Sequence, residues 1–193
     1  MSTPPGEYYT EERWNNWLDR LREEDIDPED EDSARLLLNL QDDTAIAVAK
    51  IVTDHQEGEL DEEAALEELA TIREIVLADV DFEDEEKLML VDGVQTSLVC
   101  VFYAAEEYIA GGPADDGDVE EFVRAAADAE AQEDLDAALA HCAKAGTLLF
   151  DEGDLDMEVA EEIDYGLVAE WVNGLDSLGT ALADPEVIDE DDG

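Results

Sequence analysis

Apolar residues recur at intervals of three and four along most of the chain, which is the period of an α-helix with one buried face. No alternation of apolar and polar residues is long enough to predict a β-strand. The pattern therefore predicts an all-α fold, a bundle of about seven helices at about 11–23, 31–56, 62–79, 84–110, 118–131, 133–150 and 156–182.

Helix start and stop signals set the predicted domain limits. Thr10 and Asp61 are good N-cap residues, and the Gly111-Gly112-Pro113 run is a strong stop signal. We expect a single helical domain over 10–183, with an N-terminal tail at 1–9 and an acidic tail at 184–193. The linker-like segment 111–117 leaves open a division into two lobes, 10–110 and 118–183.

The predicted helix at 84–110 contains an uncharged stretch, "GVQTSLVCVFYAA", from Gly93 to Ala105. As a helix this stretch is about 20 Å long, short of the roughly 20 apolar residues that a bilayer span needs. We therefore expect no membrane span and interpret the helix as the central, largely buried member of the bundle.

Small residues follow one face of this helix, opposite a stripe of bulky apolar side chains. They form a small-residue seam at Gly93, Ser97, Cys100 and Ala104. Small side chains let a second helix approach closely, and a matching seam runs along 133–150 at Ala138, Cys142 and Ala145. We expect the seam to pack a helix, so that leucine at Gly93 or Ala104 would overpack the core. The alternative is that the small residues leave room for a ligand.

Two segments are candidate protein interfaces. The segment "RWNNWLDRLR" carries Arg13, Trp14 and Trp17, residue types that interfaces favour. The predicted helix 156–182 carries a continuous apolar stripe that includes Ile163, Leu167, Trp171, Leu175 and Leu178. Either set can pack within the monomer or bind a protein partner or a second copy of the chain.

The charge of the chain changes how its surface is interpreted. Asp and Glu account for 58 of the 193 residues and Lys and Arg for nine, giving a formal net charge of −49. Such a charge repels itself in ordinary buffer, but in molar salt the Debye length falls to about 3 Å. The composition is typical of a haloarchaeal cytosol, and "MSTPPGEYYTEE" contains no export signal, so we expect a cytoplasmic protein.

The same composition limits the partners. Clustered Lys and Arg are scarce, which argues against direct binding of nucleic acid. Weak, non-specific binding of cations is expected. An acidic protein of this kind could instead act as a cap or mimic on a basic ribosomal or nucleic-acid-binding surface.

No motif predicts a catalytic, cofactor or metal site. The chain contains no phosphate-binding loop or nucleophile elbow, and neither His55 nor His141 has the Glu three residues earlier that di-iron bundles use. Cys100 and Cys142 are interpreted as buried free thiols, with a Cys100–His141 dyad as the alternative. An enzyme whose carboxylates or thiols meet only in the folded chain remains a third hypothesis.

The segments "YYTEERWNNWLDRLREEDIDPEDEDSARLLLNLQDDTAIAVAKIV" and "EEKLMLVDGVQTSLVCVFYAAEEYI" resemble haloarchaeal members of an archaeal family catalogued as a domain of unknown function. The resemblance extends to about residue 183. It implies a halophilic source and a helical fold, and it implies no activity. Our leading hypothesis is a non-enzymatic helical protein that works by binding other proteins, in a homodimer or a larger assembly.

Overall fold

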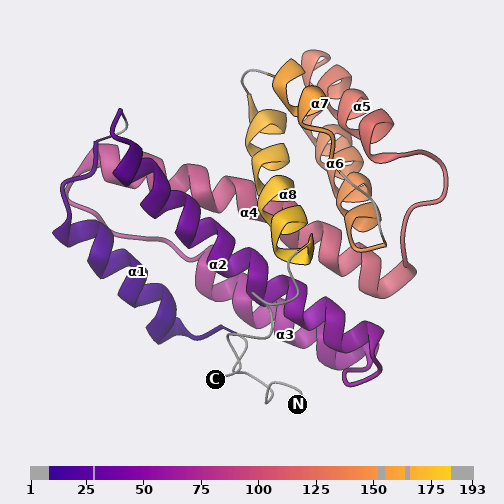
Figure 1. The fold of residues 1–193 in the computed structure, drawn as a ribbon, viewed down its shortest axis with the longest axis horizontal. Coiled ribbons are helices and arrows are strands. Elements are labelled where there is room, and N and C mark those ends of the chain that lie inside the picture. Colours follow the sequence, from indigo (N-terminus) through magenta and orange to yellow (C-terminus); the bar gives the residue numbers. More distant parts are fainter. Residues whose placement is uncertain (1–8, 28, 152–154, 164–165, 184–193) are drawn as a thin grey trace.

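The computed structural model describes residues 9–27, 29–151, 155–163 and 166–183. Within these residues the regular elements are all α-helices, so the all-α prediction is confirmed (Figure 1). Of the tails predicted at 1–9 and 184–193, only Tyr9 lies within the described residues. The helices are α1 (Glu11–Glu23), α2 (Glu31–Gln56), α3 (Glu62–Val76), α4 (Glu85–Gly111), α5 (Val119–Ala131), α6 (Leu135–Leu149), α7 (Met157–Glu162) and α8 (Leu167–Ala183).

Helix α4 is central, as predicted. It contacts α2, α3, α6 and α8, and Figure 1 shows it running behind α2 and α8 from one side of the molecule to the other. Its 27 residues are long and apolar enough to cross a membrane, with a mean hydropathy of 1.6 over the most apolar window. Half of that window is buried inside the protein, so packing against four helices accounts for its apolar character.

The acidic composition contributes directly to where the helices begin. The side chain of the residue preceding each of seven helices accepts a hydrogen bond from a backbone N–H in the first turn. Negative charge at this end is also favoured by the helix dipole. The capping residues are Thr10, Asp30, Asp61, Asp84, Asp118, Asp134 and Asp156.

Helix α3 ends at Val76, three residues before its predicted end. The reason lies on α4, where the Gln95 side-chain amide donates hydrogen bonds to the carbonyl oxygens of Val76 and Ala78, at 2.8 and 3.0 Å. These bonds satisfy carbonyls that a longer helix would have used. Residues 77–84 consequently form a non-helical connection between α3 and α4.

The predicted helix 156–182 is two helices, so the bundle has eight helices among its described residues rather than about seven. Ile163 follows α7, and Gly166 precedes α8 with φ of +104°. One Glu130 carboxylate oxygen, from α5, accepts hydrogen bonds from the backbone N–H of Leu167 and Val168, at 2.7 and 3.2 Å. A residue distant in sequence therefore caps α8 and fixes its start.

The small-residue seam of α4 packs against two other helices. Gly174 of α8 lies against the backbone carbonyl of Ser97, and Gly146 of α6 lies against the Cβ of Ala104. A Cβ at either glycine would collide with those atoms. Cys100 between them is fully buried. Helices thus approach α4 closely at Ser97 and Ala104, and the residues that make the approach possible are glycines.

Gly93 does not behave as the sequence predicted, because a Cβ built there meets nothing within 4 Å. The overpacking expected for leucine at this position therefore does not begin at its Cβ. We expect Gly93→Ala to raise the free energy of unfolding by about 0.5–1 kcal/mol, since alanine restricts the unfolded chain and favours helix. Ala104→Leu should instead lower it by about 1–3 kcal/mol. Thermal unfolding in molar KCl would measure both, and equal destabilisation by the two would contradict the packing described.

Candidate functional site

The two cysteines are the first candidates for chemistry, and the structure makes them neighbours. Cys100 on α4 and Cys142 on α6 are free and completely buried. Burial, together with the neighbouring Cys142 thiol, raises the pKa of the Cys100 thiol. A nucleophilic cysteine needs a lowered pKa and access for its substrate, so this environment favours two core thiols.

Within the described residues, His141 and Glu107 are the next candidates for chemistry. The Nδ1 atom of His141 is buried without a hydrogen-bond partner among the described residues. Burial raises the pKa of the Glu107 carboxyl, and the Lys144 charge opposes that effect. Across the described ranges, no group of three or more His, Cys, Asp and Glu side chains is arranged to hold a metal ion.

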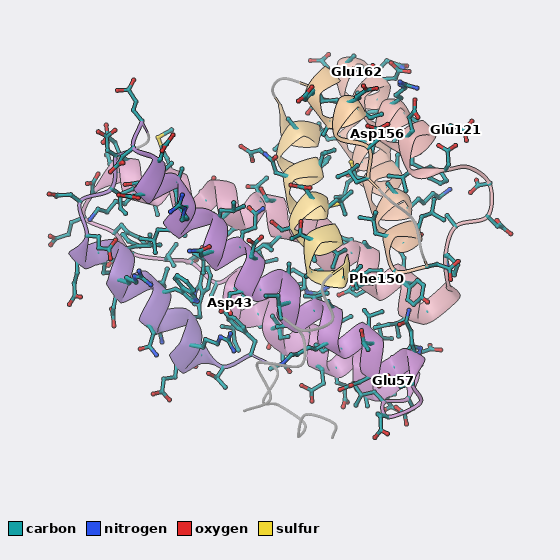
Figure 2. All side chains as sticks on the ribbon, viewed as in Figure 1. Asp43, Glu57, Glu121, Phe150, Asp156 and Glu162 are labelled. Carbon is teal, nitrogen blue, oxygen red and sulfur yellow. The ribbon has the colours of Figure 1, made fainter. Side chains whose placement is uncertain are left out.

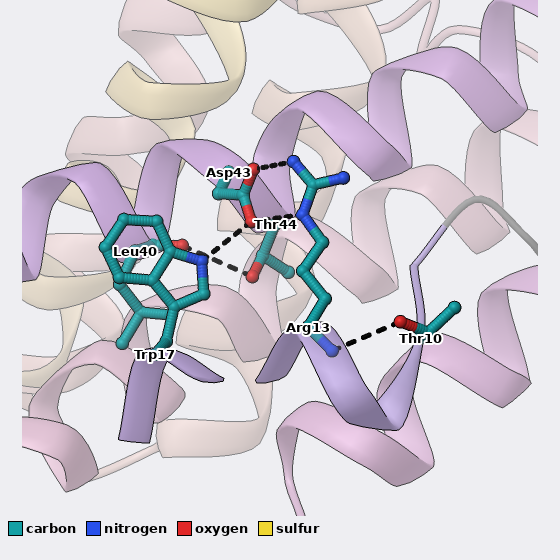
Figure 3. A network of polar contacts seen from close by, with 6 residues as sticks. All are labelled: Thr10, Arg13, Trp17, Leu40, Asp43 and Thr44. Atoms are coloured by element: carbon teal, nitrogen blue, oxygen red, sulfur yellow. Dashed lines mark hydrogen bonds and ion pairs between the residues drawn. The ribbon is translucent and has the colours of Figure 1, made fainter. Parts of the chain in front are cut away.

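The first predicted interface, on α1, is held against α2. The Arg13 Nε donates to Asp43 Oδ2 at 2.8 Å, and its Nη2 donates to Asp43 Oδ1 (Figure 3). Trp17 Nε1 donates to the same Asp43 Oδ2 at 2.9 Å. Trp14 is buried, with 3% of its surface exposed. Asp43 is thus the anchor of α1, and nothing in the sequence singled it out among the acidic residues.

Asp43 and its neighbour Asp42 provide a matched pair for testing this anchor. We expect Asp43→Asn to lower the free energy of unfolding by about 1–3 kcal/mol, because the substitution weakens a bidentate ion pair and leaves donors without full partners. Asp42→Asn should leave stability unchanged or raise it, since burial and the nearby Asp176 raise the pKa of the Asp42 carboxyl against a smaller effect of Ser177. Thermal unfolding would compare them, and equal effects would argue against the anchor.

The second predicted interface lies mostly inside the monomer. Trp171, Leu175 and Leu178 on α8 are buried, while Leu167 and Ile163 are half-buried. Helix α8 packs against α2 and α4, which precede the connecting segment 111–117 in the sequence, and against α5 and α6, which follow it. The break before α8 also interrupts the stripe that was predicted to be continuous. The apolar side chains of α8 therefore stabilise the fold of a single chain.

An open hollow of about 680 Å³ lies between α4 and the connection 77–84 that joins it to α3, and we call it the α3–α4 groove. Its apolar lining consists of Leu77, Ala78, Val80, Leu88, Met89 and Val99. Its polar lining consists of Asp79, Asp92, Gln95 and Thr96. Met89 is 74% exposed, against 51% for Leu38 and 44% for Tyr103 and Leu135.

Two further hollows border the same connection. One, of about 500 Å³, lies against α1 and α3 and shares Ala78, Asp79 and Val80 with the α3–α4 groove. The other, of about 410 Å³, is lined by Arg22, Lys87 and residues 81–84. Lys87 Nζ donates to the carbonyl oxygens of Arg22 and Glu24, at 3.0 and 2.8 Å, so this cation caps the end of α1.

Acidic side chains are spread over the surface of the helices. Figure 2 shows carboxylate oxygens projecting from the outer faces of the helices, with Glu57, Glu121 and Glu162 among those labelled. An exposed apolar groove on such an acidic surface is a candidate site of interaction with another molecule. No sequence signal pointed to the groove, because the apolar pattern predicts a helix that continues to residue 79, through one wall of the groove.

Comparison with known proteins places the chain in a family. No curated protein and no solved structure matches it. The sequence pattern of one protein family, described as "Uncharacterized protein conserved in archaea (DUF2150)", matches residues 7–191. This match covers nearly the whole chain and agrees with the resemblance to an archaeal domain of unknown function. The chain belongs to the archaeal DUF2150 family.

Proposed function

We propose that this protein is a non-enzymatic helical module that binds another protein through the α3–α4 groove, in the cytoplasm of a salt-accumulating archaeon. The observation that carries the proposal is Met89, which is 74% exposed at the edge of an apolar groove of about 680 Å³. Exposed apolar surface is costly in water and in concentrated salt, and a bound protein would cover it. Met is also well suited to binding surfaces because its side chain is flexible and polarizable.

Three other hypotheses make different predictions. A homodimer would place a second copy of this chain on the groove. An acidic cap or mimic, which the net charge of −49 supports, would bind a basic ribosomal or nucleic-acid-binding surface through many dispersed carboxylates. An enzyme would need reacting groups in an accessible cleft, and the buried Cys100 and Cys142 do not supply them.

The proposal is tested by affinity capture from native cytosol in molar KCl, with the wild-type protein, Met89→Glu and Leu135→Glu. Both substitutions add one negative charge at an exposed apolar position, so charge alone cannot distinguish them. We expect a stoichiometric protein partner with the wild type and Leu135→Glu, and its loss with Met89→Glu. If Met89→Glu and Leu135→Glu both still captured ribosomal or other basic assemblies, the acidic mimic would be supported instead.

A further inference from the structure

The side chains of the α3–α4 groove can accept hydrogen bonds but have no free donors. Both N–H groups of the Gln95 amide are used, by the carbonyl oxygens of Val76 and Ala78. The Thr96 hydroxyl donates to the carbonyl oxygen of Asp92 at 2.8 Å. When ionised, the carboxylates of Asp79 and Asp92 accept hydrogen bonds and donate none. No Lys, Arg or His lines the groove. A ligand would therefore have to bring the donors.

Two of the residues that line the groove, Asp79 and Asp92, are acidic, and Asp92 also interacts electrostatically with Glu170 outside the lining. Burial raises the pKa of the Glu170 carboxyl on α8, and the charge of Asp92 raises it further. The two carboxylates therefore repel each other across the space between α4 and α8. A cationic group placed near Asp92 would relieve this repulsion and be held by the same charges.

The apolar part of the groove has a different requirement. Leu88 and Met89 on α4, with Leu77 and Val80 on the connection, offer the apolar contacts that a groove needs to bind the apolar face of a helix. In molar salt, long-range attraction is screened to within about 3 Å, so charge acts there only through direct contact. Recognition then requires apolar burial and nearby cations in the same ligand.

We propose that the groove binds an amphipathic helix of a partner protein, with an apolar stripe bordered by Lys or Arg side chains. This inference rests on the proposed function and names the chemistry of the partner. A second copy of this chain fits poorly, because its one cluster of arginines is on α1, where Arg13 pairs with Asp43 and Arg22 with Asp19. The acidic outer faces of its other helices would repel Asp79 and Asp92.

The test uses a labelled synthetic peptide of about 15 residues, with Leu at helical spacing and Lys on both flanks. One control peptide has the same composition in scrambled order, and a second carries Glu in place of Lys. Fluorescence anisotropy in molar KCl would measure binding to the full chain. We expect saturable binding of the first peptide and at least about tenfold weaker binding of both controls.

Protein variants locate the binding. Asp92→Lys and Met89→Glu should each weaken binding of the Lys peptide by about tenfold or more. Asp128→Lys on α5 and Leu135→Glu on α6 make the same chemical changes at exposed positions outside the groove, and should change binding less than about twofold. Circular dichroism would establish that all four variants fold.

Two outcomes would overturn the inference. One is equal binding of the amphipathic and scrambled peptides, which would show attraction by charge alone. The other is an equal effect of Asp92→Lys and Asp128→Lys. If no peptide binds while capture of a native partner still depends on Met89, the partner chemistry is wrong and the proposed function stands. If no peptide binds and capture of a native partner is also independent of Met89, the proposed function and the proposed partner chemistry are both wrong.

Discussion

Gly174→Ala is expected to lower the free energy of unfolding by about 1–3 kcal/mol, and Gly174→Leu to prevent folding. A Cβ at Gly174 would collide with the carbonyl oxygen of Ser97 and would lie 3.3 Å from a methyl group of Val101. The nearest atom belongs to the backbone of the central helix, which cannot move without displacing the helices packed on it. Relief of the collision therefore requires α8 and α4 to separate.

Gly179 in the same helix is the matched control for this prediction. A Cβ there meets nothing within 4 Å, so Gly179→Ala should raise stability by about 0.5–1 kcal/mol through helix propensity. Thermal unfolding followed by circular dichroism in molar KCl would measure both variants. If Gly174→Ala were as stable as Gly179→Ala, the close contact between α8 and α4 would not exist.

Removal of salt should have the second large effect. On transfer from molar KCl to about 0.1 M KCl at pH 7, we expect the protein to lose most of its helical circular dichroism, because the Debye length rises from about 3 to 10 Å. Carboxylates on neighbouring helices then repel one another, and the nine Lys and Arg residues cannot offset 58 acids. Retention of the full helical signal in dilute buffer would contradict the expectation of a salt-dependent fold.

Acid should partly restore the fold at low salt. Burial raises the pKa of Asp42, Glu107 and Glu170 in the folded chain above the ordinary values of these carboxyls. The folded state therefore binds protons more readily than the unfolded state at these sites, and stability rises as the pH falls through the raised pKa values. A titration of circular dichroism in about 0.1 M KCl should show helix returning below neutral pH.

The predictable part of the fold is the part that local chemistry controls. The starts of α1, α2 and α3 follow from Thr10, Asp30 and Asp61, whose side chains cap the first turn of the helix that follows. The central position of α4 follows from its uncharged stretch. These features depend on residues within a few positions of one another, so the sequence pattern contains them.

The differences between expectation and structure arise from side chains distant in sequence. Gln95 on α4 holds the end of α3, and Glu130 on α5 caps the start of α8. Periodicity alone extends a helix through both places. The α3–α4 groove depends on the first of these contacts, because Gln95 binds the carbonyl oxygens of Val76 and Ala78 and so positions the start of the connection.

The environment of the candidate interface residues also depends on contacts with residues distant in sequence. Trp and Arg on α1 are residue types that interfaces favour, but whether they face a partner or their own chain depends on Asp43. One aspartate among 58 acidic residues carries no signal of its own. Met89 could have been recognised as an apolar residue off the bulky stripe of α4, yet its surroundings depend on where α3 ends.

The most direct test of the central claim is site-specific photocrosslinking in native cytosol at physiological salt. A photoreactive amino acid replaces Met89 in one version of the protein and Leu135 in the other, both being exposed apolar positions. We predict one protein adduct of defined mass from position 89, larger than the 21.2 kDa chain and distinct from its dimer, and no such adduct from position 135. The same adducts from both positions, or no adduct from position 89, would contradict binding of a partner protein at the α3–α4 groove.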